Sequence, residues 1–299
     1  MSTGPASVSG GARWRSWRIV SMRSEGSSAW LLAPAALLLA VCFVAPILVV
    51  FRWSFFADGP TLEFYREIFG STLYRTILAR TLVFSLVAAV LSVVIGYPAA
   101  YFLATRPVRT RMNWLAVVLL PLWVSSLIRT YSWLILLGRE GPANMALMAL
   151  GLTDQPVQFL YGRGIVYAAM VQVLLPMAVT IMYAGMLSIE QTFIKAARIL
   201  GASPAYAFRK VFLPLSASGI TNALVICFVL SLGFFITPNL LGGPREAMIS
   251  NMIDRAVNES LEWNLAAALG VVLLLVGIAV AGILAFAIRL LTSPGRMPR

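Results

Sequence analysis

The chain has 299 residues, of which 60% are hydrophobic and only 11% charged, and it contains no histidine. The low charge argues against an ordinary soluble domain, in which about 25% of residues are charged, and the missing histidine excludes a His-based catalytic triad. The net charge of +12 lies in short segments between apolar runs, which favours a membrane-topology interpretation over nucleic-acid binding.

Two cysteines, Cys42 and Cys227, both lie inside apolar runs. We expect them to be small buried hydrophobic side chains rather than a disulfide pair or metal ligands. Because there is no histidine and the two thiols are far apart in sequence, we expect neither a metal site nor a cofactor.

Residues 1–29 form a basic N-terminal tail in which the segment Arg13-Trp14-Arg15-Ser16-Trp17-Arg18 mixes cations with aromatic rings. Such mixtures are typical of interfacial anchors on an anionic leaflet. A regulatory or nucleic-acid role is the weaker alternative, and we expect no nucleic-acid partner.

Six apolar runs follow, each long enough to cross about 30 Å of hydrocarbon. They are residues 30–51, 76–104, 113–137, 164–187, 219–236 and 265–289. The first begins only after the basic tail and is longer than a signal-peptide core, so we interpret it as a retained helix. The sequence predicts an all-α integral membrane protein, with a transmembrane domain over residues 30–291 and a C-terminal tail over residues 292–299.

The placement of lysine and arginine predicts the orientation. If the N-terminus is cytoplasmic, 14 of the 23 basic residues lie on the cytoplasmic side, opposed there only by Glu25 and Glu190. The other side carries nine basic and nine acidic residues. This is the positive-inside pattern, and with six spans it predicts that both termini are cytoplasmic.

Three prolines, Pro98, Pro121 and Pro176, interrupt apolar runs and remove backbone hydrogen bonds. Such breaks act as hinges in some transporters, although prolines are also common in membrane helices without a special function. Arg129 lies toward the outer end of the third run. It is either a pathway-lining or gate residue or an anchor that reaches the outer headgroups, and the sequence leaves both open.

The long connection between the fourth and fifth runs, residues 188–214, is expected to begin with a short helix. Ser188 and Gln191 have the spacing of a capping box. Gly201 suits the left-handed residue that ends a helix.

A second short helix is expected to follow at once. Ser203 is a favourable N-cap, Pro204 occupies the first helical position, and Pro214 is expected to stop the helix. We call residues 188–214 the elbow, because two helices joined by a glycine are expected there.

Each predicted elbow helix carries an apolar stripe. The stripe of the first is Ile189, Phe193, Ala196 and Leu200, and that of the second is Phe208, Val211, Phe212 and Leu215. This is more apolar surface than the elbow can bury on its own spans, which predicts a protein partner on the cytoplasmic side. An amphipathic loop lying on lipid headgroups is the alternative.

Part of the elbow follows a spacing pattern: Ala196-Ala197, three residues, Gly201, nine residues, then Val211-Phe212-Leu213-Pro214. It resembles the motif E-A-A-x-x-x-G-x(9)-I-x-L-P of binding-protein-dependent ABC importer permeases. The resemblance implies the six-span, MetI-like fold of type I importers and an elbow that docks on an ATP-hydrolysing subunit. The coupling residues that it implies are Lys195, Ala196, Ala197, Arg198, Gly201, Leu213 and Pro214.

Lys195 departs from this motif, because it stands where the family usually has glutamate. The substitution reverses a charge, which puts in doubt any salt bridge that the glutamate would make to the ATPase. Glu190 lies five residues earlier and is not an equivalent position on the helix. Val211 in place of isoleucine is a minor change.

Residues 120–133 and 237–244 narrow the resemblance to spermidine/putrescine-type permeases, and in particular to their B-type subunit. The likeness covers about residues 30–290 and implies import of a polyamine or a related small polar solute. The candidate translocation-pathway residues lie in these two stretches: Arg129, Tyr131, Trp133 and Pro238.

The outer connection, residues 238–264, has the apolar pattern of a helix that lies along the outer surface. Its acidic residues could guide a cationic solute inward; they are Glu246, Asp254, Glu259 and Glu262. A solvated face that contacts a binding protein, or only solvent, is the interpretation that we favour.

The chain contains no Gly-x-x-x-x-Gly-Lys-[Ser/Thr] sequence, so it cannot supply its own phosphate-binding loop. We therefore expect a non-enzymatic permease in a bacterial inner membrane. Its expected partners are two ATPase subunits, a second permease, a soluble binding protein and the lipid bilayer. An ion-coupled secondary transporter is the main alternative, but no acidic residue lies in the middle of any run.

Overall fold

The structure is a computed structural model that describes residues 29–57 and 59–292, without the side chains of residues 29–32, 191, 289, 291 and 292. The expected tails lie outside these residues, except for Ala29 and Thr292, which belong to helices. The described elements are helical, and the extended contacts among them amount to one isolated bridge between Phe56 and Pro60.

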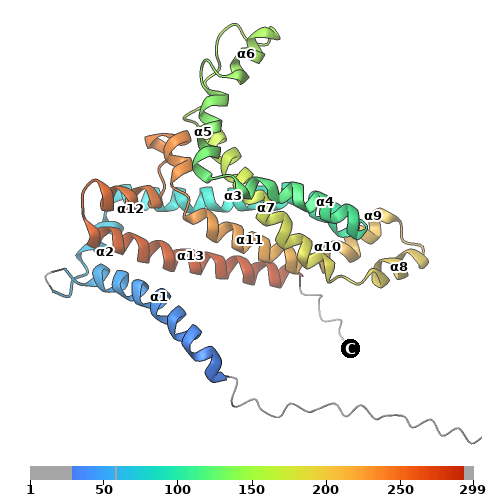
Figure 1. Ribbon diagram of the computed structural model, residues 1–299, viewed down its shortest axis with the longest axis horizontal. Helices are drawn as coiled ribbons and strands as arrows, with labels where there is room; N and C mark the ends of the chain where they lie inside the picture. The colour runs from blue at the N-terminus through green and yellow to red at the C-terminus, as the bar shows by residue number, and fades with distance from the viewer. Residues whose placement is uncertain (1–28, 58, 293–299) are drawn as a thin grey trace, which may run out of the picture. The chain divides into compact units, whose positions relative to one another are not determined.

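Four helices are long and apolar enough to cross a membrane (Figure 1). They are α1 (Ala29–Phe55), α3 (Thr72–Thr105), α7 (Arg163–Leu187) and α13 (Trp263–Thr292). Two bent helix pairs bring the number to six if each pair counts as one span. The predicted all-α membrane architecture is therefore confirmed, and each predicted run has its helix or helix pair.

The first unit of the chain, up to Val49, is described as the greater part of α1. Its described side chains are exposed, Cys42 among them. Cys42 lies within this apolar helix and is a free thiol. The residues from Val50 onward form the second unit.

The third predicted span is not one straight helix. It consists of α4 (Val108–Leu119), the 3₁₀ turn η1 (Leu120–Trp123) and α5 (Ser126–Leu137), followed by α6 (Pro142–Ala149). The axis turns by 86° between residues 108–123 and 126–149. Pro121 lies in η1, and Val124 and Ser125 adopt extended ψ angles of 130° and 139°. A proline that lacks an amide donor, followed by extended backbone, accounts for the break.

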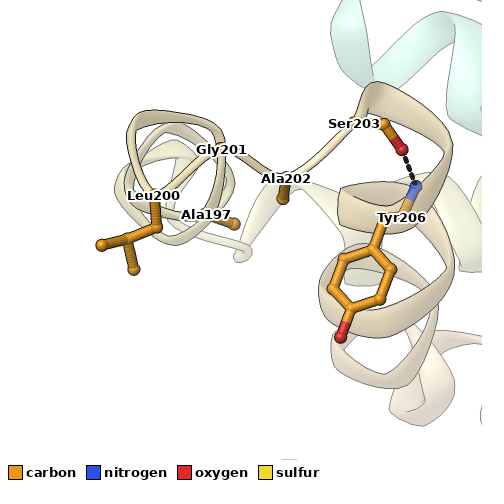
Figure 2. A pocket seen from close by; sticks show the side chains of 6 residues that line it. All are labelled: Ala197, Leu200, Gly201, Ala202, Ser203 and Tyr206. Carbon is orange, nitrogen blue, oxygen red and sulfur yellow. Dashed lines mark hydrogen bonds between the residues drawn. The ribbon is translucent and has the colours of Figure 1, made fainter.

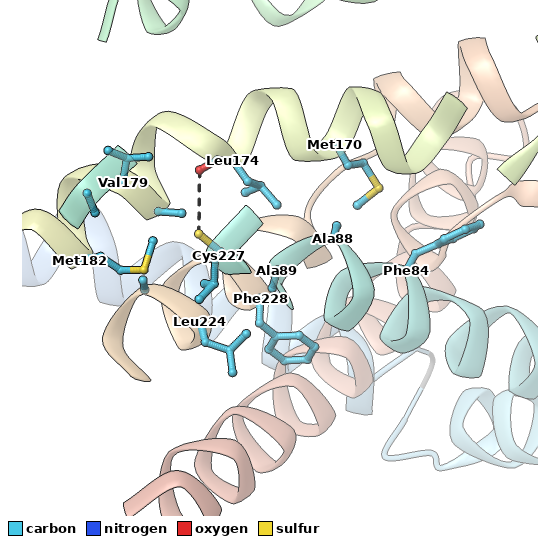
Figure 3. Packing of buried hydrophobic residues seen from close by; sticks show 14 of the residues in the cluster. Phe84, Ala88, Ala89, Met170, Leu174, Val179, Met182, Leu224, Cys227 and Phe228 are labelled. Atoms are coloured by element: carbon cyan, nitrogen blue, oxygen red, sulfur yellow. Dashed lines mark hydrogen bonds between the residues drawn. The ribbon is translucent and has the colours of Figure 1, made fainter. Parts of the chain in front are cut away.

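Helices α3, α7 and α11 (Ala217–Leu232) form the main core (Figure 3). Small side chains on α3, Ala88 and Ala89, allow the larger side chains of α7 and α11 to approach closely. Cys227 on α11 is fully buried, with its sulfur 4.0 Å from the carbonyl oxygen of Leu174. The prediction of a buried, unpaired thiol is confirmed for Cys227.

Two glycines allow α7 and α11 to cross in backbone contact. A Cβ atom added to Gly185 would lie 2.7 Å from the Cα of Gly219 and 3.3 Å from its amide nitrogen. A Cβ added to Gly219 would lie 3.3 Å from the carbonyl oxygen of Met182. No larger residue fits this crossing unless the helices separate.

A second apolar cluster joins α2 (Glu63–Gly70), the start of α3, α12 (Ile249–Asn258) and the start of α13. The predicted helix in the connection after the fifth span is α12, which is confirmed. Its first amide, that of Ile249, donates to the hydroxyl of Thr81 on α3 at 2.9 Å. The connection is thus fixed to the bundle by both apolar packing and a buried hydrogen bond.

The fifth span ends four residues earlier than predicted, at Leu232, and the backbone leaves the helix at residues 233–235. It resumes in the π-helical turn η3 (Pro238–Gly242) and the 3₁₀ turn η4 (Pro244–Glu246). Side chains from α12 satisfy carbonyls freed by the break: Ser250 donates to Phe234 at 2.6 Å, and Asn251 donates to Phe235 at 2.8 Å. Broken backbone inside a membrane domain needs such partners, because lipid offers none.

Candidate functional site

The elbow is the candidate functional site, and its first helix is α8 (Gln191–Ile199). The predicted capping box is wrong. Glu190, not Ser188, occupies the N-cap position, and its side chain makes no capping bond to the described residues. The hydroxyl of Ser188 instead donates to the carbonyl of Gly185 at 2.8 Å, so this serine closes α7 rather than opening α8.

Gly201 ends α8 as predicted. Its φ angle is +88°, a left-handed backbone that glycine adopts without strain. The amide of Gly201 donates to the carbonyl of Arg198, and the amide of Ala202 donates to that of Ala197, each at 3.1 Å. A Cβ at Gly201 would meet nothing within 4 Å, so the need for glycine is conformational rather than steric.

Ser203 starts the second half of the elbow, also as predicted. Its hydroxyl accepts a hydrogen bond from the amide of Tyr206 at 3.3 Å, and Pro204 is the first residue of α9 (Pro204–Ala207) (Figure 2). This is the N-cap that the Ser-Pro pair indicates.

The second helix ends at Leu215, one residue after Pro214 and close to the predicted stop. The π-helical turn η2 (Phe208–Phe212) and α10 (Leu213–Leu215) carry the helix to this point, and the axis turns by 56° between residues 204–215 and α11. In η2 the amide of Leu213 bonds to the carbonyl of Phe208, five residues back. This wider turn accounts for the tolerance of Pro214, because the clash of a proline ring arises in a regular helix.

Aromatic rings fix the second half of the elbow to α3. We call Tyr97, Tyr101, Phe208 and Phe212 the aromatic cluster. The ring of Tyr101 lies 5.2 Å from that of Phe208 and 4.9 Å from that of Phe212, both edge to face. The hydroxyl of Tyr97 lies 3.0 Å from that of Ser216, within hydrogen-bonding distance. Phe208 and Phe212 of the predicted apolar stripe therefore pack against α3, a span of the same chain.

Helix α8 packs differently from the stripe that was predicted for it. Ile194 and Ala197 are half-buried, and Ile194 packs against the main core, while Phe193 is exposed. The side chains of Ile199 and Leu200 are 85% and 88% exposed. Of the predicted stripe, Ile189 alone is buried. Periodicity was correct in predicting an amphipathic helix, but it placed the buried face about one residue off.

A groove separates the two halves of the elbow (Figure 2). Its volume is about 580 Å³, and it is lined by Ala197, Leu200, Gly201, Ala202, Ser203 and Tyr206. Leu200 and Tyr206 lie on opposite sides of it, and small residues lie between them. The groove therefore exposes backbone and apolar side chains together, which suits the close approach of another protein.

The remaining predicted coupling residues are exposed. They are Lys195, Ala196, Arg198, Leu213 and Pro214. The structure thus brings Lys195, Ala196, Ala197, Arg198 and Gly201 together on α8 and its end. Leu213 and Pro214 lie apart from them, at the far end of the second half.

The four candidate pathway residues have different environments. Arg129 donates from Nη2 to the carbonyl of Val124 at 2.9 Å, across the break in the third span, while its Nε and Nη1 make no hydrogen bond within the described residues. Tyr131 is 50% exposed. Pro238 is buried at the start of η3.

Trp133 reveals a polar residue that the sequence analysis missed. Its indole Nε1 donates to Oε1 of Gln172 on α7 at 2.7 Å. Gln172 is exposed, ten residues into a 25-residue membrane helix. A polar amide within an otherwise apolar run is the signal that could have identified it. Amides at this depth need polar partners.

In the outer connection, Glu246 is only 7% exposed. Its carboxylate accepts from Nε of Arg163 at 3.1 and 3.3 Å. The suggestion that Glu246 guides cations inward is therefore not supported by its position, because it is buried and already paired. The ion pair instead fixes η4 to the start of α7.

Comparison with known proteins assigns the family. Residues 92–292 match the family described as the binding-protein-dependent transport system inner membrane component. The chain belongs to this family. The permease is also 32% identical over 216 residues to the spermidine/putrescine transport system permease protein PotB of Escherichia coli (strain K12), covering 72% of the permease and 78% of PotB.

Solved structures show the same fold. A chain from a bacterial ABC transporter that imports the acidic polysaccharide alginate superposes with a TM-score of 0.72 at 21% identity, covering 88% of the permease and 94% of that chain. A chain of the MetNI methionine ABC transporter gives a TM-score of 0.52 at 19% identity, with 74% and 97% covered. The predicted MetI-like permease fold is confirmed.

Family membership also decides the class of function. The permease is an inner-membrane subunit of a binding-protein-dependent ABC importer, in which separate subunits hydrolyse ATP. Its partners include a solute-binding protein and an ATPase. The ion-coupled secondary transporter is no longer favoured.

Proposed function

We propose that the permease imports a polyamine such as spermidine or putrescine, together with a second permease subunit and two ATPase subunits. The 32% identity to PotB over most of both chains carries the choice of solute. A soluble binding protein would deliver the solute on the outer side. Closure of the two ATPases on ATP would then turn the permease pair from inward-facing to outward-facing.

The elbow is the part that receives this movement. The exposed side chains of Ile199 and Leu200, beside a groove lined by small residues, support docking on an ATPase. The aromatic cluster would transmit the movement, because it joins the second half of the elbow to α3, while α10 leads through the bend at Ser216 into α11.

Tyr131, Trp133 and Gln172 are the residues that we assign to the solute path. Indole and phenol rings attract ammonium groups through their faces, and the amide oxygen of Gln172 has a second lone pair besides the one bound to Trp133. We assign Arg129 and Pro238 to shaping the broken helices instead, since Arg129 bonds to Val124 across the break and Pro238 is buried.

The test uses the complete importer in proteoliposomes, with its binding protein and labelled spermidine or putrescine. ATP-dependent uptake and solute-stimulated ATP hydrolysis are the expected results. Ala197→Trp fills the groove, and Gly201→Pro forbids the φ of +88°. Both should abolish stimulated hydrolysis while membrane insertion stays intact.

Ala146→Trp, on an exposed position of α6, is the matched control and should retain stimulation. Wild-type stimulation in the Ala197→Trp and Gly201→Pro importers would contradict docking at the elbow. If the importer takes up neither spermidine nor putrescine but another solute stimulates its ATP hydrolysis, the proposed solute is wrong. The proposed docking at the elbow would be unaffected by that result.

A further inference from the structure

Lys195 and Ile199 lie one turn apart on α8, on the side that faces away from the bundle. Ile194 and Ala197 define the inward side, because they are its half-buried residues. At 3.6 residues per turn, Lys195 and Ile199 project from the opposite side, and residues at i and i+4 are surface neighbours. A partner that covers the isoleucine must therefore also cover the lysine.

The charge of the elbow is one-sided. Glu190 is the single acidic residue in its sequence, against Lys195, Arg198, Arg209 and Lys210. All four cations are exposed, and none of them forms an ion pair in the part of the chain that the structure describes. The cations are thus available to a partner.

Docking at this surface removes water from charged groups. Ile199 is 85% exposed, and its burial would bring the partner against the neighbouring ammonium group of Lys195. An ammonium group that loses water without gaining an anion opposes binding, whereas a carboxylate in hydrogen-bonding reach offsets the loss. A partner surface that buries Ile199 and places a carboxylate beside Lys195 therefore favours binding.

We propose that the ATPase groove that receives this elbow is acidic, with a carboxylate that pairs with Lys195 and a second that pairs with Arg198. The inference rests on the proposed docking of the elbow on an ATPase. It adds the charge of the ATPase residues that meet the elbow. They are acidic, because the elbow carries the basic Lys195 where the motif usually has an acidic glutamate.

A protein groove fits these observations better than an anionic lipid surface does. The groove of about 580 Å³ between Leu200 and Tyr206 is open and lined mostly by small residues. A convex protein surface can fill such a space, whereas a planar array of headgroups would leave it empty. Charge complementarity therefore points to a protein that carries the acids.

The experiment measures the binding of the importer's own ATPase subunits to the purified permease pair in lipid nanodiscs at increasing salt. Lys195→Glu/Arg198→Glu reverses the two elbow charges. Arg106→Glu/Arg109→Glu makes the same change of net charge at two exposed positions, just after α3 and in the first turn of α4, and serves as the matched control. Lys195→Met removes one charge and retains most of the apolar stem.

We expect the double elbow variant to lose ATPase affinity at least about tenfold, Lys195→Met to lose less, and the control to bind as the wild type does. A groove Asp→Lys or Glu→Lys change in the ATPase should restore binding to the elbow variant. The affinity of the wild type should fall with salt, and the elbow variant should show a weaker dependence on salt.

Equal affinities for the elbow variant and the control would overturn the acidic groove. Ala197→Trp separates this failure from a failure of docking itself, because it should prevent binding whatever the sign of the charges. An effect of charge reversal that occurs in discs with phosphatidylglycerol but is absent in phosphatidylcholine would assign the cations to lipid headgroups and would also overturn the proposal.

Discussion

The crossing of α7 and α11 at Gly185 and Gly219 gives a steric prediction with a calculable size. In Gly185→Ala the new Cβ lies 2.7 Å from a backbone carbon of Gly219. Carbon atoms attract each other at about 3.5–4.0 Å, so the helices must separate by about 1 Å. Because the atom that the Cβ meets belongs to the backbone of Gly219, and alanine has no side-chain torsion that moves its Cβ, no side-chain rotation can relieve the clash.

Overpacking of this kind costs about 1–3 kcal/mol of unfolding free energy. Gly270→Ala is the matched control, since a Cβ there meets nothing within 4 Å and the residue also lies inside a membrane helix. Both alanines gain the same helix propensity, so the difference between the variants isolates the steric cost. Gly219→Ala should be intermediate, because its nearest contact is 3.3 Å away.

Reversible unfolding of the purified permease in mixed SDS–detergent micelles measures these free energies. The expected order of stability is Gly270→Ala, then Gly219→Ala, then Gly185→Ala. If Gly185→Ala is as stable as Gly270→Ala, or more stable than Gly219→Ala, the reasoning from backbone contact is refuted.

Three further predictions concern hydrogen bonds. Thr81→Val should lower the unfolding free energy by about 1–3 kcal/mol in the same assay, because the buried amide of Ile249 loses its acceptor; an unchanged value would contradict this. Ser203→Ala removes an N-cap worth about 0.5–2 kcal/mol, so limited proteolysis should cut the elbow faster than in the wild type, and an equal rate would count against the cap. Gln172→Leu leaves the indole of Trp133 without its partner and should lower polyamine uptake while ATPase assembly, measured by co-purification, stays normal. Normal uptake in this variant would remove Gln172 from the path.

The sequence was sufficient to predict the membrane class, the number of spans and the glycine link in the elbow. Long apolar runs dominate the energetics of insertion, and a residue such as Gly201 has few alternatives at a φ of +88°. Ser203 and Pro204 were predictable for the same reason, because their effect on the backbone is local.

The errors arose where tertiary contacts decide the outcome. Local rules predicted that Ser188 caps the first elbow helix, but its hydroxyl bonds to the carbonyl of Gly185 at the end of α7. The buried face of α8 is fixed by its contact with the bundle, which short-range periodicity cannot specify. Gln172 depends on Trp133, 39 positions away in the sequence, so its hydrogen bond was not visible from either segment alone.

The two ends of the fifth span are held by different forces. At one end, the carbonyls of Phe234 and Phe235 accept hydrogen bonds from Ser250 and Asn251, and such bonds weaken steeply once their angle falls below about 120°. At the other end, edge-to-face packing of Tyr101 on Phe208 and Phe212 provides most of the contact, with one hydroxyl contact between Tyr97 and Ser216. Because two carbonyls are fixed to α12 at one end and ring packing holds most of the other, we expect the span to pivot about its α12 end, so that any displacement is largest beside the elbow.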